Sequence, residues 1–314
     1  MSISGGVFWN CEQRRLRTLW RLLLGLIILL AVGVILGLAL PILWRVMGAA
    51  THVTAPLPLS LRFATRLLQT MLAVWLAGRF LDHRAFAGCG FRLNRAWWLD
   101  LAFGLALGAV LMAGIFMTEW AAGWVTVVGM WRVDPTSRSL AQALLAPLVL
   151  FLAVGIQEEL LFRGYLLRNL AEGLRFRAQN GALPSLAAWL LSSAVFGLAH
   201  AANPNASLAS TTNLVFAGLF LGLGYVLTGE LAISIGLHVT WNLFQGSVFG
   251  FPVSGTQFSR TTVIAISQSG PHLWTGGAFG PEAGLVGFVA GAAGTLLILA
   301  WVRWRRGKIA LPSW

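Results

Sequence analysis

The chain has 314 residues, of which 57% are hydrophobic and only 10% are charged, and its mean hydropathy is +0.77. A soluble protein carries about 25% charged residues, so a soluble globular protein is excluded. The two cysteines, Cys11 and Cys89, are too few for a secreted disulfide scaffold. Fifteen Trp and nineteen Phe exclude a disordered chain. The composition therefore predicts a polytopic membrane protein.

Eight apolar segments approach the length of about 20 residues that crosses a bilayer as a helix. They lie near 20–42, 63–81, 99–119, 140–167, 185–202, 213–228, 231–250 and 283–302. No linker is long enough to separate two domains. We expect an all-α, polytopic membrane helix bundle of about eight transmembrane helices. It divides into an N-terminal region of three spans, 1–138, and a core, 139–314, that carries the polar motifs.

Basic residues are distributed unevenly between the two sides that these spans define. If the N-terminus is cytoplasmic, the inside segments hold 15 Lys and Arg and the outside segments hold 6, including Arg66. This asymmetry predicts that both termini are cytoplasmic. The net charge of +12 would indicate a nucleic-acid partner in a soluble protein. Here it indicates cytoplasmic loops beside anionic lipid headgroups, and no nucleic-acid partner is expected.

Ionisable and polar groups at membrane depth are costly and therefore need a partner or a function. They concentrate in three of the predicted helices, at Glu158, Glu159, Arg163, His200, His238 and Asn242. Four other acidic residues stand at predicted helix ends, where we expect their charges to reach water: Asp100, Glu119, Glu230 and Glu282.

Helical spacing predicts different partners for the two adjacent glutamates. Glu159 and Arg163 are four residues apart and share a helix face, so they can form an ion pair. Glu158 points about 100° away from Glu159 and is free to meet another helix or a water molecule. His238 and Asn242 are also four residues apart, so their side chains project from one stripe.

A cluster of carboxylate, imidazole and amide groups could bind a metal ion, or activate water and stabilise an oxyanion. The tentative metal ligands are Glu158, His200 and His238, with zinc as the ion that this donor set favours. The alternative is structural: an ion pair and hydrogen-bonded histidines that hold helices together.

Three motifs in order resemble the CAAX prenyl protease and bacteriocin-processing (CPBP, or Abi) family of intramembrane proteases. They are Glu158-Glu159-x-x-x-Arg163, Phe196-x-x-x-His200 and His238-x-x-x-Asn242. The similarity covers roughly 140–250, with 283–302 as a final family helix, and residues 1–138 carry no motif of the family.

The resemblance implies a helical membrane endopeptidase that cuts near the C-terminus of its substrate or within a signal-like segment. Glu158 would be the base that activates water, with assistance from His200. Glu159 and Arg163 would orient the site. His238 and Asn242 would hold the oxyanion, or His238 would be a ligand in a metal-dependent version.

Two other functions remain open. Some family members are linked to bacteriocin immunity or membrane scaffolding, so a non-catalytic membrane interaction protein of the same fold is the main alternative. A transporter with a proton relay is disfavoured because no pair of similar halves is visible. The expected partners are the lipid bilayer and a membrane-associated protein or peptide substrate. With 21 Arg against one Lys, the composition points to a bacterial cell membrane.

Overall fold

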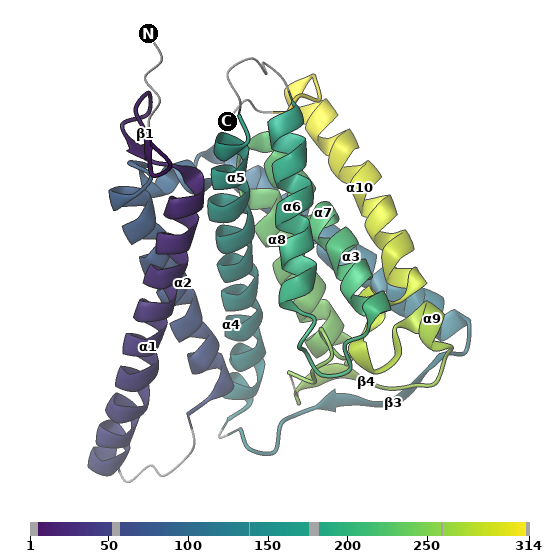
Figure 1. The fold of residues 1–314 in the computed structure, drawn as a ribbon. Helices are drawn as coiled ribbons and strands as arrows, with labels where there is room; N and C mark the ends of the chain where they lie inside the picture. Colours follow the sequence, from purple (N-terminus) through teal and green to yellow (C-terminus); the bar gives the residue numbers. More distant parts are fainter. Residues whose placement is uncertain (1–5, 52–56, 138, 176–181, 259, 312–314) are drawn as a thin grey trace.

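The computed structural model describes residues 6–51, 57–137, 139–175, 182–258 and 260–311. The described chain is mostly helical, and its long helices stand side by side as a bundle (Figure 1). The predicted all-α membrane bundle is thereby confirmed. Large apolar side chains cover the outward faces of the bundle, as on Leu26 and Ile27 near the chain's beginning and Leu296 near its end. Such a surface is suited to lipid.

Each of the eight predicted segments contains a helix. The helices that occupy them are α1 (Thr18–Thr51), α2 (Leu59–Phe80), α3 (Arg95–Ala121), α4 (Leu140–Glu159), α6 (Leu183–Ala199), α7 (Leu208–Thr228), α8 (Ala232–Leu243) and α10 (Leu285–Arg306). A π-helical segment, Leu160–Leu167, joins α4 to α5 (Arg168–Gly173). A single turn, α9, covers His272–Thr275.

Five of the helical stretches are long and apolar enough to cross a membrane by length and composition. They are Thr18–Gly48, Arg95–Ala121, Leu140–Gly173, Leu208–Thr228 and Leu285–Arg306. The other three predicted spans do not meet this criterion of length and composition. Helices α6 and α8 have only 17 and 12 residues, and α2 contains three arginines. Each of the eight predicted transmembrane segments is therefore helical, but only five of the described helices meet the length and composition of a membrane span.

The short helix α8 occupies the interior of the bundle, where it packs against α3, α4 and α7. Its residues Ala232–Thr240 are all buried. Two glycines on α3 allow the closest of these contacts. A Cβ atom on Gly104 would lie 2.4 Å from the carbonyl oxygen of Ile233, and one on Gly108 would lie 2.5 Å from that of Leu237. This Gly-x-x-x-Gly pair therefore sets how close the helix that carries His238 stands to α3.

Side-chain caps fix where several helices begin. The Asn94 side chain accepts a hydrogen bond from the backbone N–H of Trp97 at the start of α3, and Ser139 accepts one from Gln142 at the start of α4. Ser207 and Ser210 form a reciprocal capping box at the start of α7. Residue 138, at the predicted domain boundary, lies outside the described residues, and that boundary stays a prediction.

A two-stranded antiparallel ribbon is the main element that the sequence did not predict. Strand β3 (Val125–Arg132) follows α3 and pairs with β4 (Thr262–Gln268), with a register shift between Val127 and Gly129. The ribbon lies across the end of the bundle opposite the start of α1 (Figure 1). A second, very short pair, β1 (Trp9–Asn10) and β2 (Arg15–Leu16), precedes α1.

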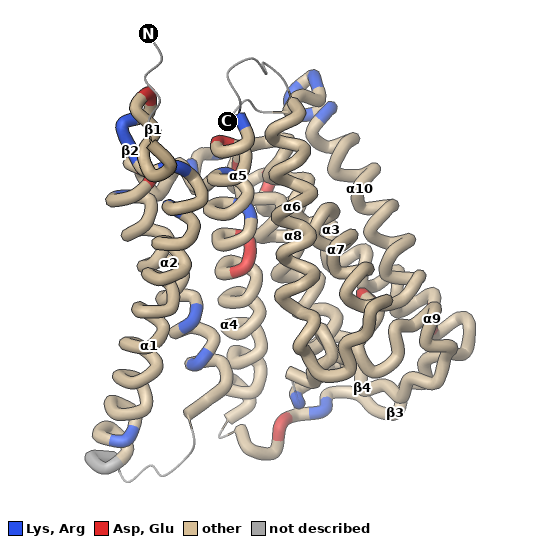
Figure 2. Tube along the Cα trace, viewed as in Figure 1, with Lys and Arg blue, Asp and Glu red and all other residues tan. Residues whose placement is uncertain are grey.

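The start of α1 and the end of α10 lie at the same end of the bundle, where Lys and Arg residues gather (Figures 1 and 2). A chain that crosses the membrane an even number of times has both termini on the same side. The gathering of basic residues at this end agrees with the uneven distribution of Lys and Arg in the sequence. That this end faces the cytoplasm stays a prediction.

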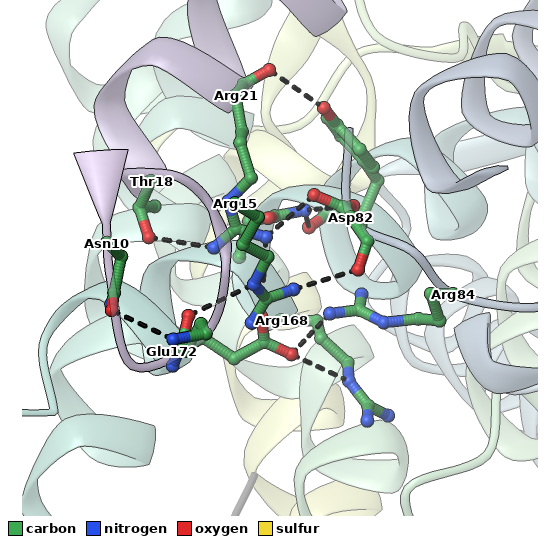
Figure 3. Close-up of polar contacts among 11 residues, drawn as sticks. Asn10, Arg15, Thr18, Arg21, Asp82, Arg84, Arg168 and Glu172 are labelled. Atoms are coloured by element: carbon green, nitrogen blue, oxygen red, sulfur yellow. Dashed lines mark hydrogen bonds and ion pairs between the residues drawn. The ribbon is translucent and has the colours of Figure 1, made fainter. Parts of the chain in front are cut away.

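Several of the arginines at this end form an ion-pair cluster instead of facing lipid headgroups (Figure 3). Arg21 Nη1 lies 2.7 Å from Asp82 Oδ1, and both side chains are only 1% exposed. Arg15 Nη2 lies 2.9 Å from Glu172 Oε2, and Arg84 pairs with the same carboxylate. The cluster ties the start of α1 and the loop after α2 to α5.

The expectation that acidic residues at helix ends reach water was wrong for three of them. Asp100, Glu119 and Glu282 are buried, with exposed fractions of 3%, 0% and 8%. Asp100 accepts a hydrogen bond from Trp301 Nε1, and Glu119 accepts one from Gln268 on β4. The neighbouring helix or the ribbon covers these helix ends, which a pattern of apolar segments cannot show. Glu230 is half-buried and pairs with Arg92.

Candidate active site

The two adjacent glutamates stand at the junction between α4 and the π-helical segment. Glu158 and Glu159 are the last two residues of α4, and the wider turns of Leu160–Leu167 begin immediately after them. A π-turn inside an α-helix is rare and occurs frequently at functional sites because it redirects the side chains around it. A second π-helical segment, Phe244–Val248, follows α8 just beyond Asn242.

Glu159 is fully buried and is paired from two sides. Its Oε1 atom accepts a hydrogen bond from Arg163 Nη1 at 2.9 Å and lies 2.8 Å from His238 Nδ1. The predicted ion pair between Glu159 and Arg163 is therefore confirmed. Because the carboxylate is also within hydrogen-bond distance of the imidazole, α4 is linked to α8 at this point.

Arg163 is held by three different groups in the interior. Besides Glu159, its Nη2 atom donates to the carbonyl oxygen of Gly218 on α7 at 2.8 Å. Its guanidinium carbon lies 4.6 Å from the centroid of the Phe196 ring on α6. The side chain is only 1% exposed, so these contacts replace water around a buried charge. Arg163 consequently fixes Glu159 and joins α4 to α6 and α7.

Glu158 faces the two histidines, as its angular position predicted. Its Oε2 atom lies 3.9 Å from His200 Nε2 and 3.8 Å from His238 Nε2, and its side chain is 20% exposed. His200 is the C-cap residue of α6, and its Nδ1 lies 2.8 Å from the carbonyl oxygen of Phe196. Three helices thus bring a carboxylate and two imidazoles together.

The hydrogen bond at the Nδ1 atom of each imidazole determines whether its Nε2 atom, which faces Glu158, donates or accepts. The Nδ1 atom of His238 faces a carboxylate and that of His200 faces a carbonyl, so each Nδ1 carries the proton and donates. In the neutral imidazoles, both Nε2 atoms are then acceptors. Two nitrogen lone pairs and a carboxylate oxygen converge, so the group between them must be a proton donor such as water, or a cation.

A cavity of 760 Å³ opens beside this cluster. Glu158, His200, His238 and Asn242 all line it, together with mainly apolar side chains of α4, α7 and α10. Asn242 lies one turn beyond His238 on α8, and both are buried, with exposed fractions of 8% and 5%. The cavity therefore offers an apolar space with a few polar groups on its wall, the usual form of a ligand or substrate site.

Two imidazoles and a carboxylate are the kind of ligands that a catalytic zinc site uses. In the part of the chain that the structure describes, no three His, Cys, Asp or Glu side chains are arranged to share an ion as they stand. The separations of 3.8 and 3.9 Å exceed the roughly 3.3 Å edge of a tetrahedral zinc site by about half an ångström. The donor types are those that zinc uses, and the metal stays a prediction.

Residues 140–244 match the family model described as Type II CAAX prenyl endopeptidase Rce1-like. This segment, about a third of the chain, is similar to that family. All seven named motif residues, from Glu158 to Asn242, fall within the match. No curated protein and no solved structure matched the chain.

The Rce1-like segment spans α4 to α8 and contains every helix that contributes to the cluster. It confirms the resemblance recognised from the three motifs, which covered about the same residues. It also supports a protease of the CAAX type, and the apolar helices show a membrane protein.

Several polar residues of the cavity wall lie outside the motifs and were not predicted from the sequence as site residues. Gln157, Asn203, Asn213, Ser254 and Glu282 come from different helices and loops. Nothing in a single sequence brings such separate positions together. A sixth residue, Arg66, was counted with the outside segments in the sequence, although it lies within the predicted span 63–81 and lines the cavity.

Proposed function

We propose that this protein is an intramembrane endopeptidase that hydrolyses a peptide bond of a membrane-associated protein or peptide substrate. The observation that carries the proposal is the convergence of Glu158 Oε2 with the Nε2 atoms of His200 and His238 at the wall of an apolar cavity. Three acceptor atoms around one point are arranged to hold and deprotonate a water molecule. The Rce1-like match supports the same class of reaction.

In the proposed mechanism, Glu158 is the general base. A water molecule donates hydrogen bonds to Glu158 and to His200, and Glu158 removes a proton as the water oxygen attacks the carbonyl carbon of the substrate. The proton then passes from Glu158 to the nitrogen of the leaving peptide as the C–N bond breaks. The partly apolar surroundings of Glu158 strengthen these electrostatic interactions, because little water competes for them.

His238 and Asn242 would stabilise the negative oxygen of the tetrahedral intermediate. The amide of Asn242 can donate directly, whereas His238 must be protonated at Nε2 to donate. Its contact with the Glu159 carboxylate fixes the orientation of the imidazole, so that Nε2 faces Glu158. Glu159 and Arg163 are then positioning residues that orient His238 and do not touch the substrate.

In the metal-dependent alternative of this proposal, Glu158, His200 and His238 would instead hold a zinc ion. A bound zinc ion lowers the pKa of a coordinated water and polarises a carbonyl group. We further propose that the protein resides in a bacterial cell membrane, with the termini in the cytoplasm.

The proposed function is tested by comparing the membrane-associated peptides of cells that carry the native gene, no gene, or the Glu158→Gln variant. A substrate should appear as a fragment pair that is present in the first cells and absent from the other two. Identical peptide sets in all three would contradict the endopeptidase and favour the non-catalytic membrane interaction protein.

A further inference from the structure

A buried carboxyl group outside the three motifs lies on the wall of the cavity. It belongs to Glu282, which stands in the short turn Pro281–Ala283 before α10 and is only 8% exposed. This residue lies beyond 140–244, the part of the chain that is similar to the family. A carboxyl group is costly to bury, so its hydrogen-bond partners indicate what it does in that place.

Both carboxyl oxygens of Glu282 accept hydrogen bonds from other parts of the wall. Oε2 accepts from Nε2 of Gln245, a residue of the π-helical segment three positions beyond Asn242. Oε1 accepts from the backbone N–H and from the hydroxyl group of Ser254. Gln245 Nε2 also donates to the carbonyl oxygen of Pro252 at 2.6 Å. The loop that carries Ser254 is therefore held by Glu282 and Gln245 together.

The backbone of this loop is strained at Ser254. Its φ of 47° places a non-glycine residue in the left-handed region, and Gly255 beside it has a φ of 80°. Such a conformation persists only where the surroundings hold it. The hydrogen bonds to Glu282 and the backbone bridge between Val253 and Thr256 supply that support. Glu282 thus stabilises a tight turn, residues 253–256, on the cavity wall.

The 253–256 turn contacts the segment that follows His200. Asn203 Nδ2 donates to the carbonyl oxygen of Ser254 at 3.0 Å. The two segments approach so closely that a Cβ atom on Gly255 would lie 1.8 Å from the carbonyl oxygen of Pro204. The turn therefore determines where the segment after α6 lies.

His200 needs such a support more than the other two groups of the cluster. It is the C-cap residue of α6, whereas Glu158 and His238 are followed by further helical residues. The backbone N–H of Asn203 donates to the carbonyl oxygen of His200 at 3.0 Å. Hydrogen bonds therefore connect Glu282 to His200, residue by residue.

We propose that Glu282 is a positioning residue that holds His200 in place beside Glu158 by way of this turn, an inference that rests on the proposed endopeptidase function. The separation of 3.9 Å between His200 Nε2 and Glu158 Oε2 depends on where the end of α6 lies. The proposed water molecule binds both atoms, so a shift of this helix end weakens its binding. Because both oxygens of Glu282 are bonded within the protein, Glu282 acts through His200 and not on the substrate.

NMR of the histidine rings measures this positioning apart from catalysis. Full-length protein is labelled with ¹⁵N in its histidines, and the ring signals are assigned with His200→Gln and His238→Gln. We expect Glu282→Ala to shift and broaden the signals of His200 and to leave those of His238, which Glu159 holds, unchanged. Glu282→Gln keeps an oxygen that can accept from Ser254, so it should restore the native signals of His200.

Two further variants separate this effect from a general loss of structure. Asn203→Ala breaks the next link at a half-buried position, so it should disturb His200 in the same way even where Glu282→Ala does not fold. Glu230→Ala is the control, because it removes a carboxyl group that pairs with Arg92 just beyond the end of α7. For a peptide that spans the cut site of the fragment pair, Glu282→Ala and Asn203→Ala should lower kcat about tenfold and change KM by less than about twofold.

Native His200 signals in both Glu282→Ala and Asn203→Ala would overturn the proposal. Equal changes at His200 and His238 would also overturn it, because they would show a general loosening of the bundle. A raised KM at unchanged kcat would place Glu282 on the substrate and would contradict the positioning role. His200 signals that depend on Glu282 and Asn203, in a protein that cleaves no peptide, would support this proposal and contradict the proposed enzyme function alone.

Discussion

The Nδ1 atom of His238 lies 2.8 Å from Oε1 of Glu159, the same oxygen that accepts a hydrogen bond from Arg163. Because of this contact, the two adjacent glutamates have different roles. Glu159 is buried and holds the imidazole in one tautomer, so that Nε2 of His238 faces Glu158. Glu158, with 20% of its side chain exposed, is the carboxylate that a substrate in the cavity can reach.

The contact between α3 and α8 predicts a matched pair of glycine substitutions. In Gly108→Ala the new Cβ would lie 2.3 Å from Thr240 Oγ1 and 2.5 Å from the carbonyl oxygen of Leu237, so the helices must separate. We expect a loss of about 1–3 kcal/mol in the free energy of unfolding. Gly114→Ala on the same helix meets nothing within 4 Å and should cost nothing. Thermal unfolding in detergent measures both, and equal melting temperatures would contradict the close packing.

The helices and the cluster were predictable because each depends on local patterns. Apolar length fixes where a membrane helix can form, and the spacing of Glu159 and Arg163 determines that they share a face. The convergence of His200 and His238 on Glu158 was inferred only because costly polar groups at membrane depth need partners.

Other features depend on contacts between distant segments, which no local pattern contains. The pairing of Val125 with Gln268 joins positions 143 residues apart, and the ribbon then buries Glu119. The ion pair between Arg21 and Asp82 similarly joins the start of α1 to the loop after α2. The π-helical turns of Leu160–Leu167 beside Glu158 were likewise not predicted from the sequence.

The buried carboxyl of Glu282 predicts a specific pH dependence of stability. Burial raises its pKa more than the hydrogen bonds from Ser254 and Gln245 lower it. With the folded-state pKa above the unfolded-state value, the stabilising contribution is complete below the ordinary pKa of a glutamate and is lost as pH rises through the folded pKa. The melting temperature of the native protein should therefore fall relative to that of Glu282→Gln as pH is raised across this window. Parallel curves would contradict this assignment.

The two cysteines test the orientation of the bundle. Cys11 is exposed in the turn between β1 and β2, whereas Cys89 is buried and its pKa is raised by that burial, so its thiol stays protonated and unreactive. In a Cys89→Ala protein, a membrane-impermeant maleimide should label Cys11 in inverted vesicles and not in intact spheroplasts. In a Cys11→Ala protein, Cys89 should react only after denaturation. Labelling of Cys11 from outside would reverse the predicted cytoplasmic location of the termini.

The predicted zinc ion is tested by elemental analysis of protein purified without chelator. We expect close to one zinc per chain, and His238→Ala should lose it because one of three ligands is gone. Asn242→Ala is the control, since an amide at that place is not among the predicted ligands. Protein that cleaves its substrate at the full rate with no divalent metal bound would contradict the zinc prediction and leave the water-activating role of Glu158 intact.

The central claim is that Glu158 activates water while Glu159 positions His238, and one paired substitution tests it most directly. Cleavage of a membrane substrate and thermal stability should be measured together for Glu158→Gln and Glu159→Gln. Glu158→Gln should abolish cleavage with nearly native stability. Glu159→Gln should leave Arg163 buried without its partner, losing about 3–5 kcal/mol of stability as well as activity. Full cleavage by Glu158→Gln, or a loss of stability alone in both variants, would contradict the enzyme and make the cluster a structural one.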